Sequence, residues 1–237
     1  MRSKISKIAI LALPLVCLLF PLRQEAVPTV NPDGEKYVAL TFDDGPSRST
    51  TAQLLDGLQE RGAHATFFVI GEQIAGNEEL IRRMQAEGHQ VGNHTYTHVR
   101  LDQSRNAMRE IGKTQETLSS ILGEGNYWLR PPWGFMNRAA AQKIAVPMLY
   151  WSIDTDDWRI KDAAAIEKHI LDNVKDGDVI LLHEGYPTSV AATLSTIDAL
   201  SEEGYQFVTV DELFARAGVT AQKGVMYRRA DTVYRFK

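Results

Sequence analysis

The chain has 237 residues, a formal net charge of -4 and an apolar share of 44%, so it can bury a sizeable core in one large domain or two small ones. Its basic residues are scattered along the sequence, which argues against a nucleic-acid-binding protein, because such a protein would concentrate them on one face. The one cysteine, Cys17, excludes an intramolecular disulfide and a zinc site made of thiolates.

The N-terminal segment has the layout of an export signal. Cationic residues precede an apolar run at residues 8–22, which is short for a membrane span of about 20 apolar residues and contains prolines. A buried core helix would also be apolar, but the cationic flank favours a signal. We therefore expect residues 1–26 to be a signal peptide or a membrane anchor, with membrane association through residues 8–22 in the second case. Residues 27–35 are expected to be a linker, and residues 36–237 a folded domain outside the cytoplasm.

Beyond the linker, short apolar runs alternate with stretches of helical periodicity. The runs predict strands at residues 38–42, 66–70, 89–93, 127–130, 148–153, 179–183 and 207–210. Apolar residues at helical spacing predict helices around residues 54–58, 80–84, 108–122, 166–174 and 194–200. Apolar strands that alternate with helices indicate a parallel sheet covered on both faces. We expect an α/β fold, a distorted and incomplete (β/α) barrel of about seven parallel strands, rather than a doubly wound sheet.

Polar residues follow these strands, where parallel barrels place their chemistry. The first strand ends in Asp43 and Asp44, which would be costly in a core, although an Asp-Gly turn at a helix start is an ordinary alternative. The third ends in His94 and His98, which fall on one side of a helical turn, within reach of one metal ion. One aspartate and two histidines form the ligand set of a catalytic zinc site. Because Thr95 occupies the place of the glutamate in HExxH, the base must come from elsewhere, and the other aspartate can supply it.

Three later strands run into RPPWG at residues 130–134, DTDDW at 154–158 and LLH at 181–183. Together with TFDDGP and HTYTH, this order resembles the polysaccharide deacetylase family, carbohydrate esterase family 4, with its nodulation-factor-deacetylase homology domain. The resemblance covers roughly residues 36–217, and the fold of that family, a distorted seven-stranded (β/α) barrel, agrees with the strand count above. Two positions depart from the family pattern: Trp133 replaces a frequent tyrosine, and Glu184 replaces the usual aspartate.

The resemblance implies roles for the metal-side residues. Asp43 would be the general base, held in place and ionised by Arg130. Asp44, His94 and His98 would bind a divalent ion, zinc first, with Co²⁺ or another divalent ion as alternatives.

The resemblance also implies roles for the other side of the site. His183 would be the general acid, paired with Asp154. The backbone N–H of Trp133 would help to bind the oxyanion. Leu181 would line a pocket for the acetyl methyl group, and Trp158 would wall the groove.

The implied activity is removal of N-acetyl groups from an envelope or extracellular polysaccharide, with residues 36–237 as the catalytic domain of a secreted or membrane-anchored hydrolase. Peptidoglycan amino sugars are the first expectation, and chitin oligomers, poly-N-acetylglucosamine and acetyl-xylan stay open. A non-catalytic wall-glycan-binding protein on the same fold is the alternative from another class. The export signal argues against an intracellular hydrolase of small cyclic amides. We expect a monomer that acts on a polysaccharide and binds no nucleic acid.

Overall fold

The computed structural model describes residues 34–236. The expected signal or anchor at residues 1–26 and nearly all of the linker lie outside them. Within the described range, none of the helices is both long and apolar enough to cross a membrane.

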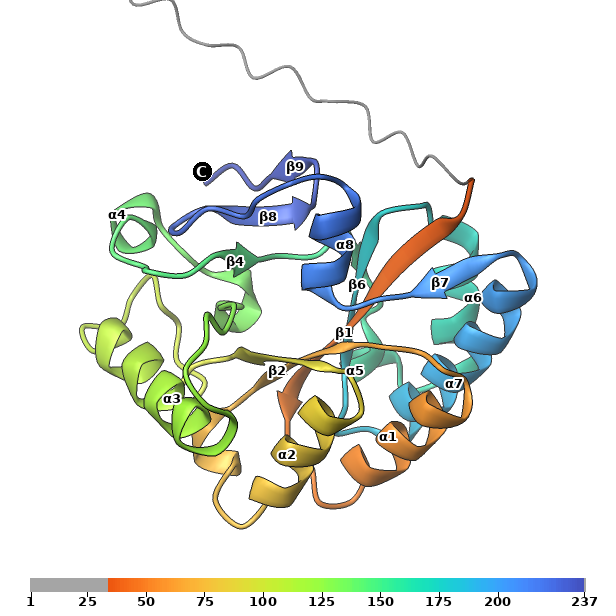
Figure 1. Ribbon diagram of the computed structural model, residues 1–237, viewed down its shortest axis with the longest axis horizontal. Coiled ribbons are helices and arrows are strands. Elements are labelled where there is room, and N and C mark those ends of the chain that lie inside the picture. The colour runs from red at the N-terminus through yellow and green to blue at the C-terminus, as the bar shows by residue number, and fades with distance from the viewer. Residues whose placement is uncertain (1–33, 237) are drawn as a thin grey trace, which may run out of the picture.

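The core of the fold is a parallel sheet whose outer side is covered by helices (Figure 1). Its strands are β1 (Lys36–Gly45), β2 (Thr66–Val69), β3 (Gln90–Asn93), β5 (Ile153–Asp154), β6 (Asp178–His183) and β7 (Tyr205–Phe207). The order is β3-β2-β1-β6-β5, and β7 pairs with the beginning of β1. The covering helices are α1 (Thr51–Glu60), α2 (Glu78–Ala86), α3 (Ala107–Leu122), α6 (Ala163–Asn173) and α7 (Pro187–Glu202).

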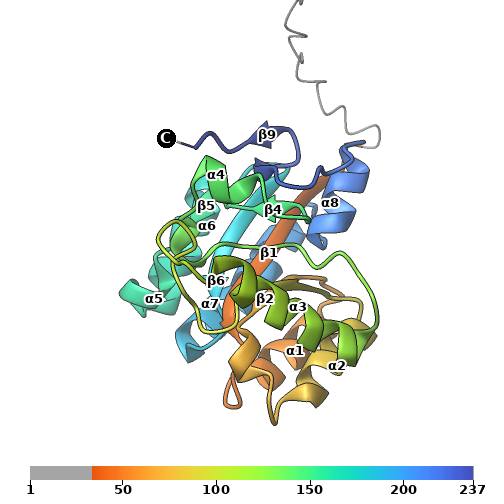
Figure 2. The ribbon, with the colours of Figure 1, turned by 90° about the vertical axis from the view of Figure 1, so that its left-hand side faces the viewer.

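A second, three-stranded sheet extends the wall of the barrel (Figure 2). It contains β4 (Met148–Leu149), β8 (Met226–Arg229) and the antiparallel β9 (Thr232–Val233). Single parallel bridges from Asn93 to Leu129 and from Leu129 to Met148 connect it to β3. The remaining elements are η1 (Gly71–Gln73), η2 (Pro132–Gly134), α4 (Arg138–Ala141), α5 (Asp157–Ile160) and α8 (Val210–Arg216). The predicted α/β barrel class is confirmed.

Strand boundaries differ from the predictions at three places. The segment expected at 127–130 makes only the bridges at Leu129, because Pro131 and Pro132 follow it and have no N–H to continue a ladder. The segment expected at 148–153 is split, because Tyr150 N–H donates to β8 whereas Ser152 N–H donates to β6. The last predicted strand stops at residue 207, because Thr209 and Glu212 form a capping box that begins α8.

Two-residue alternation along the central strands separates two cores. On β1, Val38, Leu40 and Phe42 pack under the helices, whereas Tyr37 and Ala39 face the barrel interior. On β6, Ile180 and Leu182 belong to the helix side, and Val179 and Leu181 belong to the interior. By the same alternation, Asp43 at the end of β1 and His183 at the end of β6 lie on the interior side, where the pocket is.

Candidate metal and catalytic site

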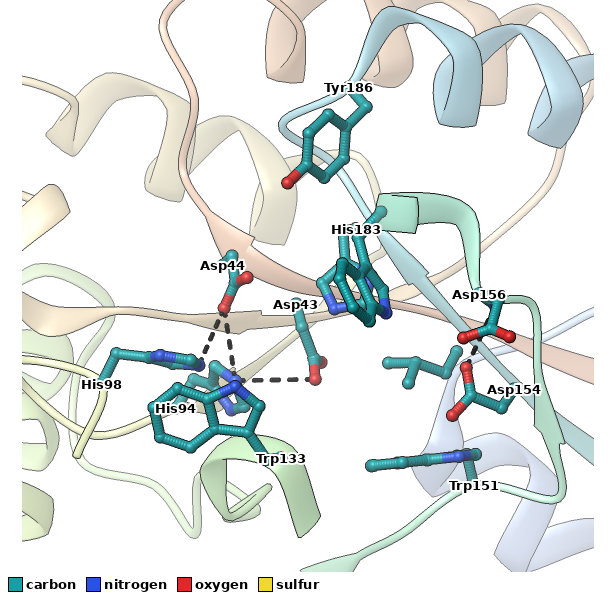
Figure 3. A pocket seen from close by; sticks show the side chains of 12 residues that line it. Asp43, Asp44, His94, His98, Trp133, Trp151, Asp154, Asp156, His183 and Tyr186 are labelled. Carbon is teal, nitrogen blue, oxygen red and sulfur yellow. Dashed lines mark hydrogen bonds and ion pairs between the residues drawn. The ribbon is translucent and has the colours of Figure 1, made fainter. Parts of the chain in front are cut away.

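The candidate site is a pocket of about 330 Å³ at the carboxyl ends of the strands (Figure 3). Its lining comes from the strands β1, β5 and β6, from the loops after β3, β4, β5 and β6, and from η2 and α5. The lining residues are Asp43, Asp44, His94, His98, Trp133, Trp151, Asp154, Asp156, Trp158, Leu181, His183 and Tyr186. The structure thus brings together every residue proposed for the site from sequence except Arg130, which lies directly behind the wall.

Three side chains could hold a metal ion. Asp44, His94 and His98 each offer one ligand atom, and these atoms lie within 4.8 Å of one another. Asp44 Oδ1 is 3.4 Å from His94 Nε2 and 3.2 Å from His98 Nε2. This oxygen is buried and has no hydrogen-bond partner among the described residues, as expected of an atom that faces a cation. One carboxylate and two imidazoles suit zinc and similar divalent ions.

The electrostatics of this group also favour a cation. Burial alone would raise the pKa of Asp44, but the adjacent His94 and His98 imidazoles outweigh it and lower that pKa well below its ordinary value. His94 Nδ1 lies 2.7 Å from the Arg130 carbonyl oxygen. If the Nδ1–H donates to that carbonyl, the Nε2 lone pair points at Asp44, which is the tautomer a metal ligand needs. The group therefore consists of an ionised carboxylate and an imidazole oriented by its second nitrogen.

The helical turn predicted for the two histidines is wrong, although their convergence is confirmed. Residues 94–100 form an irregular loop in which Thr95 and His98 have positive φ angles of 68° and 55°. Buried Asn93 shapes this loop, since its Oδ1 accepts from Thr95 N–H at 2.9 Å and its Nδ2 donates to the Ile111 carbonyl at 2.9 Å. Such a local side-chain bond competes with helix formation. The spacing of the histidines could not show this.

Asp43 is the carboxylate that Arg130 holds. Only 3% of Asp43 is exposed, and its Oδ1 accepts from Arg130 Nη1 at 2.7 Å. Arg130 is fully buried, lies over the Phe68 ring at 4.2 Å and donates through Nη2 to the Tyr150 carbonyl. The other oxygen of Asp43 is 3.6 Å from His94 Nε2, so it faces the metal group. A carboxylate fixed on one side and open on the other can act as a base at the metal.

The partner of His183 is Asp157, and the pairing expected with Asp154 is wrong. The Oδ1 of buried Asp157 is 2.7 Å from His183 Nδ1, while its Oδ2 accepts from His183 N–H at 2.7 Å and from Ser189 Oγ at 2.6 Å. Asp154 is exposed, and its Oδ1 accepts from Asp156 N–H at 3.1 Å. Asp156 adopts φ 53°, and this left-handed turn directs the next residue inward. DTDDW offers three aspartates, and the sequence alone does not show where this turn falls.

The surroundings of His183, next to Asp43, favour its protonated form. Burial lowers the pKa of His183, but the hydrogen bond to Asp157 and the charges of Asp157, Asp43 and Asp44 outweigh it and raise that pKa to about 9. Strand register places Asp43 of β1 opposite His183 of β6. Neighbouring strands lie about 4.8 Å apart, so the fold itself sets a proton acceptor and a proton donor side by side.

Glu184, noted in the sequence as a departure from the family pattern, lies behind the site. It is fully buried and accepts a hydrogen bond from Thr51 Oγ1, while its Oε1 has no partner among the described residues. A Cβ at Gly45 would meet this oxygen at 1.5 Å, so any larger residue there would displace the Glu184 side chain. Burial, together with the charges of Asp44 and Asp43, outweighs the Thr51 hydrogen bond and raises the pKa of Glu184 to about 8. Glu184 is therefore a neutral acid at pH 7.

Aromatic side chains form the rim of the pocket. Trp133 is 54% exposed, has φ 54° and places its ring 4.3 Å from that of His98. Trp158 is 48% exposed, whereas Leu181 is buried in the pocket floor. Trp151 belongs to the buried interior core and also lines the pocket, and Tyr186 follows the last motif without a sequence signal of its own. The rim is thus suited to the apolar faces of sugar rings.

Comparison with known proteins agrees with this geometry. A family model described as polysaccharide deacetylase matches residues 30–146. The peptidoglycan-N-acetylglucosamine deacetylase PgdA of Listeria monocytogenes is 39% identical over 194 residues, which are 81% of this chain and 41% of PgdA. The peptidoglycan-N-acetylmuramic acid deacetylase PdaC of Bacillus subtilis is 37% identical, with 78% of this chain and 40% of PdaC covered. The chain thus spans about two fifths of the length of these two relatives.

Shorter relatives are covered almost completely. A peptidoglycan-N-acetylglucosamine deacetylase of Bacillus cereus is 35% identical, with 81% of this chain and 97% of that protein covered. The structure of a T48 deacetylase with substrate aligns with a TM-score of 0.77 at 36% identity, over 81% of this chain and 96% of the other. A family 4 acetyl xylan esterase from Clostridium thermocellum, solved with a cobalt ion, aligns with a TM-score of 0.77 at 30% identity, over 82% and 98% of the two chains. The chain described here belongs to the polysaccharide deacetylase family, carbohydrate esterase family 4.

Proposed function

We propose that this protein is a metal-dependent hydrolase that removes N-acetyl groups from an envelope or extracellular polysaccharide, with peptidoglycan amino sugars as the first substrate class. The observation behind the proposal is one pocket that contains a three-residue metal group, a carboxylate paired with arginine and a histidine paired with aspartate. Relatives named as peptidoglycan deacetylases support the substrate class.

In the proposed mechanism, Asp44, His94 and His98 would hold a divalent ion, which would supply Lewis-acid polarisation of the substrate carbonyl and of the attacking water. Asp43 takes the proton of the attacking water, because Arg130 holds it with one oxygen free toward the metal group. The Trp133 backbone N–H is proposed to help stabilise the oxyanion. The next two amides of that loop, Gly134 and Phe135, already donate to Pro131 and Pro132.

The second proton transfer is assigned to His183. A sugar amine is a poor leaving group unless it is protonated as the carbon–nitrogen bond breaks, so an acid is required. Asp157 raises the pKa of His183 and so favours its protonated form, and His183 lies opposite Asp43 in the strand register. Leu181 is proposed to contact the acetyl methyl group, and Trp158 to wall the groove. The products would be acetate and a free amino sugar.

The identity of the ion, the location of the protein and its oligomeric state are further parts of the proposal. Zinc is the proposed ion, because a nitrogen- and oxygen-rich set of three ligands with open positions is typical of catalytic zinc, and Co²⁺ or another divalent ion is the alternative. An extracytoplasmic site of action fits a wall substrate. The protein is proposed to be secreted or anchored to the outer face of the cytoplasmic membrane, and to act as a monomer.

A second candidate activity is release of acetate from acetyl-xylan or from chitin oligomers. The acetyl xylan esterase structure with a TM-score of 0.77 is the observation in its favour. The alkoxide released from a sugar ester leaves far more readily than an unprotonated sugar amine, so an amide substrate depends more strongly on the acid that the His183–Asp157 pair would supply. A non-catalytic wall-glycan-binding protein is disfavoured, because the residues proposed as base, acid and metal ligands are all present in one pocket.

Acetate release from wall glycan, chitin oligomers and acetyl-xylan, measured side by side with added zinc or cobalt, tests the proposal. We expect release from an amide-linked substrate, fastest from wall glycan, and none from the double variant His94→Ala/His98→Ala. Release only from acetyl-xylan would support the esterase instead. Binding of wall glycan without acetate release from any of the three would support the non-catalytic protein.

A further inference from the structure

Carboxylates predominate among the charged side chains that line the pocket. Asp43, Asp44, Asp154 and Asp156 contribute four carboxylates to its lining. No lysine or arginine is among the lining residues in the part of the chain that the structure describes. An anionic group on a bound sugar would therefore meet carboxylates without a cationic side chain reserved for it.

Most of these charges are already balanced by partners. Arg130 faces Asp43 at 2.7 Å, and Asp44 belongs to the metal group. His183, the remaining cationic group at the pocket, is paired with buried Asp157. Asp156 Oδ2 accepts from Arg159 Nη2 at 2.6 Å, but Arg159 is exposed and does not line the pocket.

Asp154 is the lining carboxylate that has no cationic partner among the described residues. It is exposed, forms no ion pair with a described cation and lines the pocket with Asp156 and Trp151, on the His183 side (Figure 3). Its backbone partner, the Asp156 N–H at 3.1 Å, uses only Oδ1. His183 and Asp154 line the same pocket, so a sugar whose departing nitrogen is protonated by His183 would bring the carbon that bears this nitrogen, with its ring neighbours, into the pocket that contains this negative charge.

The two wall amino sugars differ at that ring neighbour. The acetamido group is on C2, and C3 is bonded to C2. N-acetylglucosamine has a hydroxyl on C3, which can donate a hydrogen bond to a carboxylate. N-acetylmuramic acid without its peptide has a lactyl ether there, whose carboxylate would be brought into the same pocket as the reacting amide. The lactyl carboxylate and the Asp154 carboxylate would repel each other. This repulsion would weaken binding of N-acetylmuramic acid and so favour N-acetylglucosamine.

We propose that Asp154, with Asp156, makes this pocket selective for an uncharged C3 substituent, so that N-acetylglucosamine is deacetylated in preference to peptide-free N-acetylmuramic acid. This inference rests on the proposed deacetylase function and adds the identity of the sugar. Asp154 is here a specificity-determining residue, and the effect is electrostatic repulsion of an anionic substrate.

Peptide-free glycan strands, which contain both sugars in alternation, provide the test. The zinc-loaded enzyme is incubated with them, and mass spectrometry of the muramidase fragments locates each lost acetyl group. We expect at least a tenfold preference for N-acetylglucosamine, which Asp154→Asn should reduce several-fold. Methyl esterification of the lactyl groups removes their charge but keeps their bulk, and it should reduce the preference in the same way. Asp198→Asn, which removes a carboxylate paired with Arg61 outside the pocket lining, is the matched control and should change nothing.

Binding provides a second readout. Calorimetry with the Asp43→Asn variant should show tighter binding of the esterified than of the free-acid strands, with a difference that shrinks at high salt. Equal or faster loss of acetyl from N-acetylmuramic acid, or a preference that neither esterification nor Asp154→Asn changes, would overturn the charge selectivity while the deacetylase function stands. Absence of acetate release from every glycan would instead overturn the function on which the selectivity rests.

Discussion

At the residue scale, two neighbours at the end of β6 have opposite acid–base behaviour. His183 lies on the interior face of the strand and pairs with Asp157. Glu184 lies on the helix side and accepts a hydrogen bond from Thr51. The pKa of His183 is raised to about 9 and that of Glu184 to about 8, so both hold a proton at pH 7. One is a cation at the pocket, and the other is a neutral acid behind it.

The acid assignment predicts a shift in pH dependence. A general acid must be protonated, so turnover should fall as the pH rises through the pKa of His183. Asp157→Asn removes the charge that raises this pKa, so the alkaline limb should move to lower pH, whereas Asp154→Asn should leave the limb in place. The measurement is kcat against pH, with circular dichroism to verify that the Asp157 variant is folded. If the alkaline limb of the pH profile moved only in the Asp154 variant, Asp154 rather than Asp157 would be the functional partner of His183, as expected from sequence.

Glu184 predicts a dependence of stability on pH. Its folded pKa of about 8 exceeds the unfolded value of 4.5, so between these values the folded state binds more protons and the free energy of unfolding falls as the pH rises. The slope should approach about 1.4 kcal/mol per pH unit for this group. Glu184→Gln should remove that contribution and be the more stable protein at pH 8. Urea unfolding of metal-free protein from pH 5 to 8 measures it, and equal slopes for both proteins would show that Glu184 is ionised when folded.

At the element scale, the sequence was informative about strands and much less so about the loops between them. Alternating and continuous apolar runs predicted β1, β2, β3 and β6 closely, because burial on both faces leaves a strong pattern. The loop after β3 was predicted as a helical turn, since residues four apart suggest one, but positive φ at Thr95 and His98 depends on tertiary contacts. The three proposed metal ligands still converge, because the carboxyl ends of parallel strands meet at one edge, whatever the loop conformation.

Asn93 tests how this loop positions the ligands. Its side chain bonds both the Thr95 N–H and the Ile111 carbonyl, so Asn93→Ala should loosen His94 and His98 without removing a ligand. We expect metal affinity to fall about 10–100-fold, the range typical of groups that orient metal ligands. Competition with a chelator measures the affinity. Asn106→Ala, at a helix start where the side chain makes no capping bond, is the control and should bind metal normally.

At the scale of the whole molecule, the C-terminal segment completes the wall behind the pocket. β8 pairs with β4, and Arg229 donates to Asp178 Oδ1 at 2.8 Å. Tyr234 lies 4.5 Å from the Tyr150 ring, which stacks on Trp151 of the pocket at 3.9 Å. The sequence did not predict these strands, because β8 and β9 are short and partly polar and their pairing is between segments far apart in the chain.

This segment should therefore matter for stability. Arg229→Ala leaves the buried Asp178 without its cationic partner, and loss of such a charge-assisted bond typically costs about 1.5–3 kcal/mol. We expect a clearly lower melting temperature by scanning calorimetry. Lys168→Ala, which breaks an exposed ion pair with Asp172 on α6, should leave the melting temperature nearly unchanged. Equal effects of the two substitutions would mean that the tail contributes little to the fold.

The central claim is that Asp44 binds the metal while its neighbour Asp43 moves the proton. Metal content and acetate release, measured together on Asp43→Asn and Asp44→Asn, test it most directly. Asp43→Asn should keep a full complement of zinc and lose about 10²–10⁴-fold in turnover, because it removes only the base. Asp44→Asn should lose the zinc itself, because it replaces one of the three ligands. A metal-free Asp43→Asn enzyme beside a metal-loaded Asp44→Asn enzyme would contradict the account.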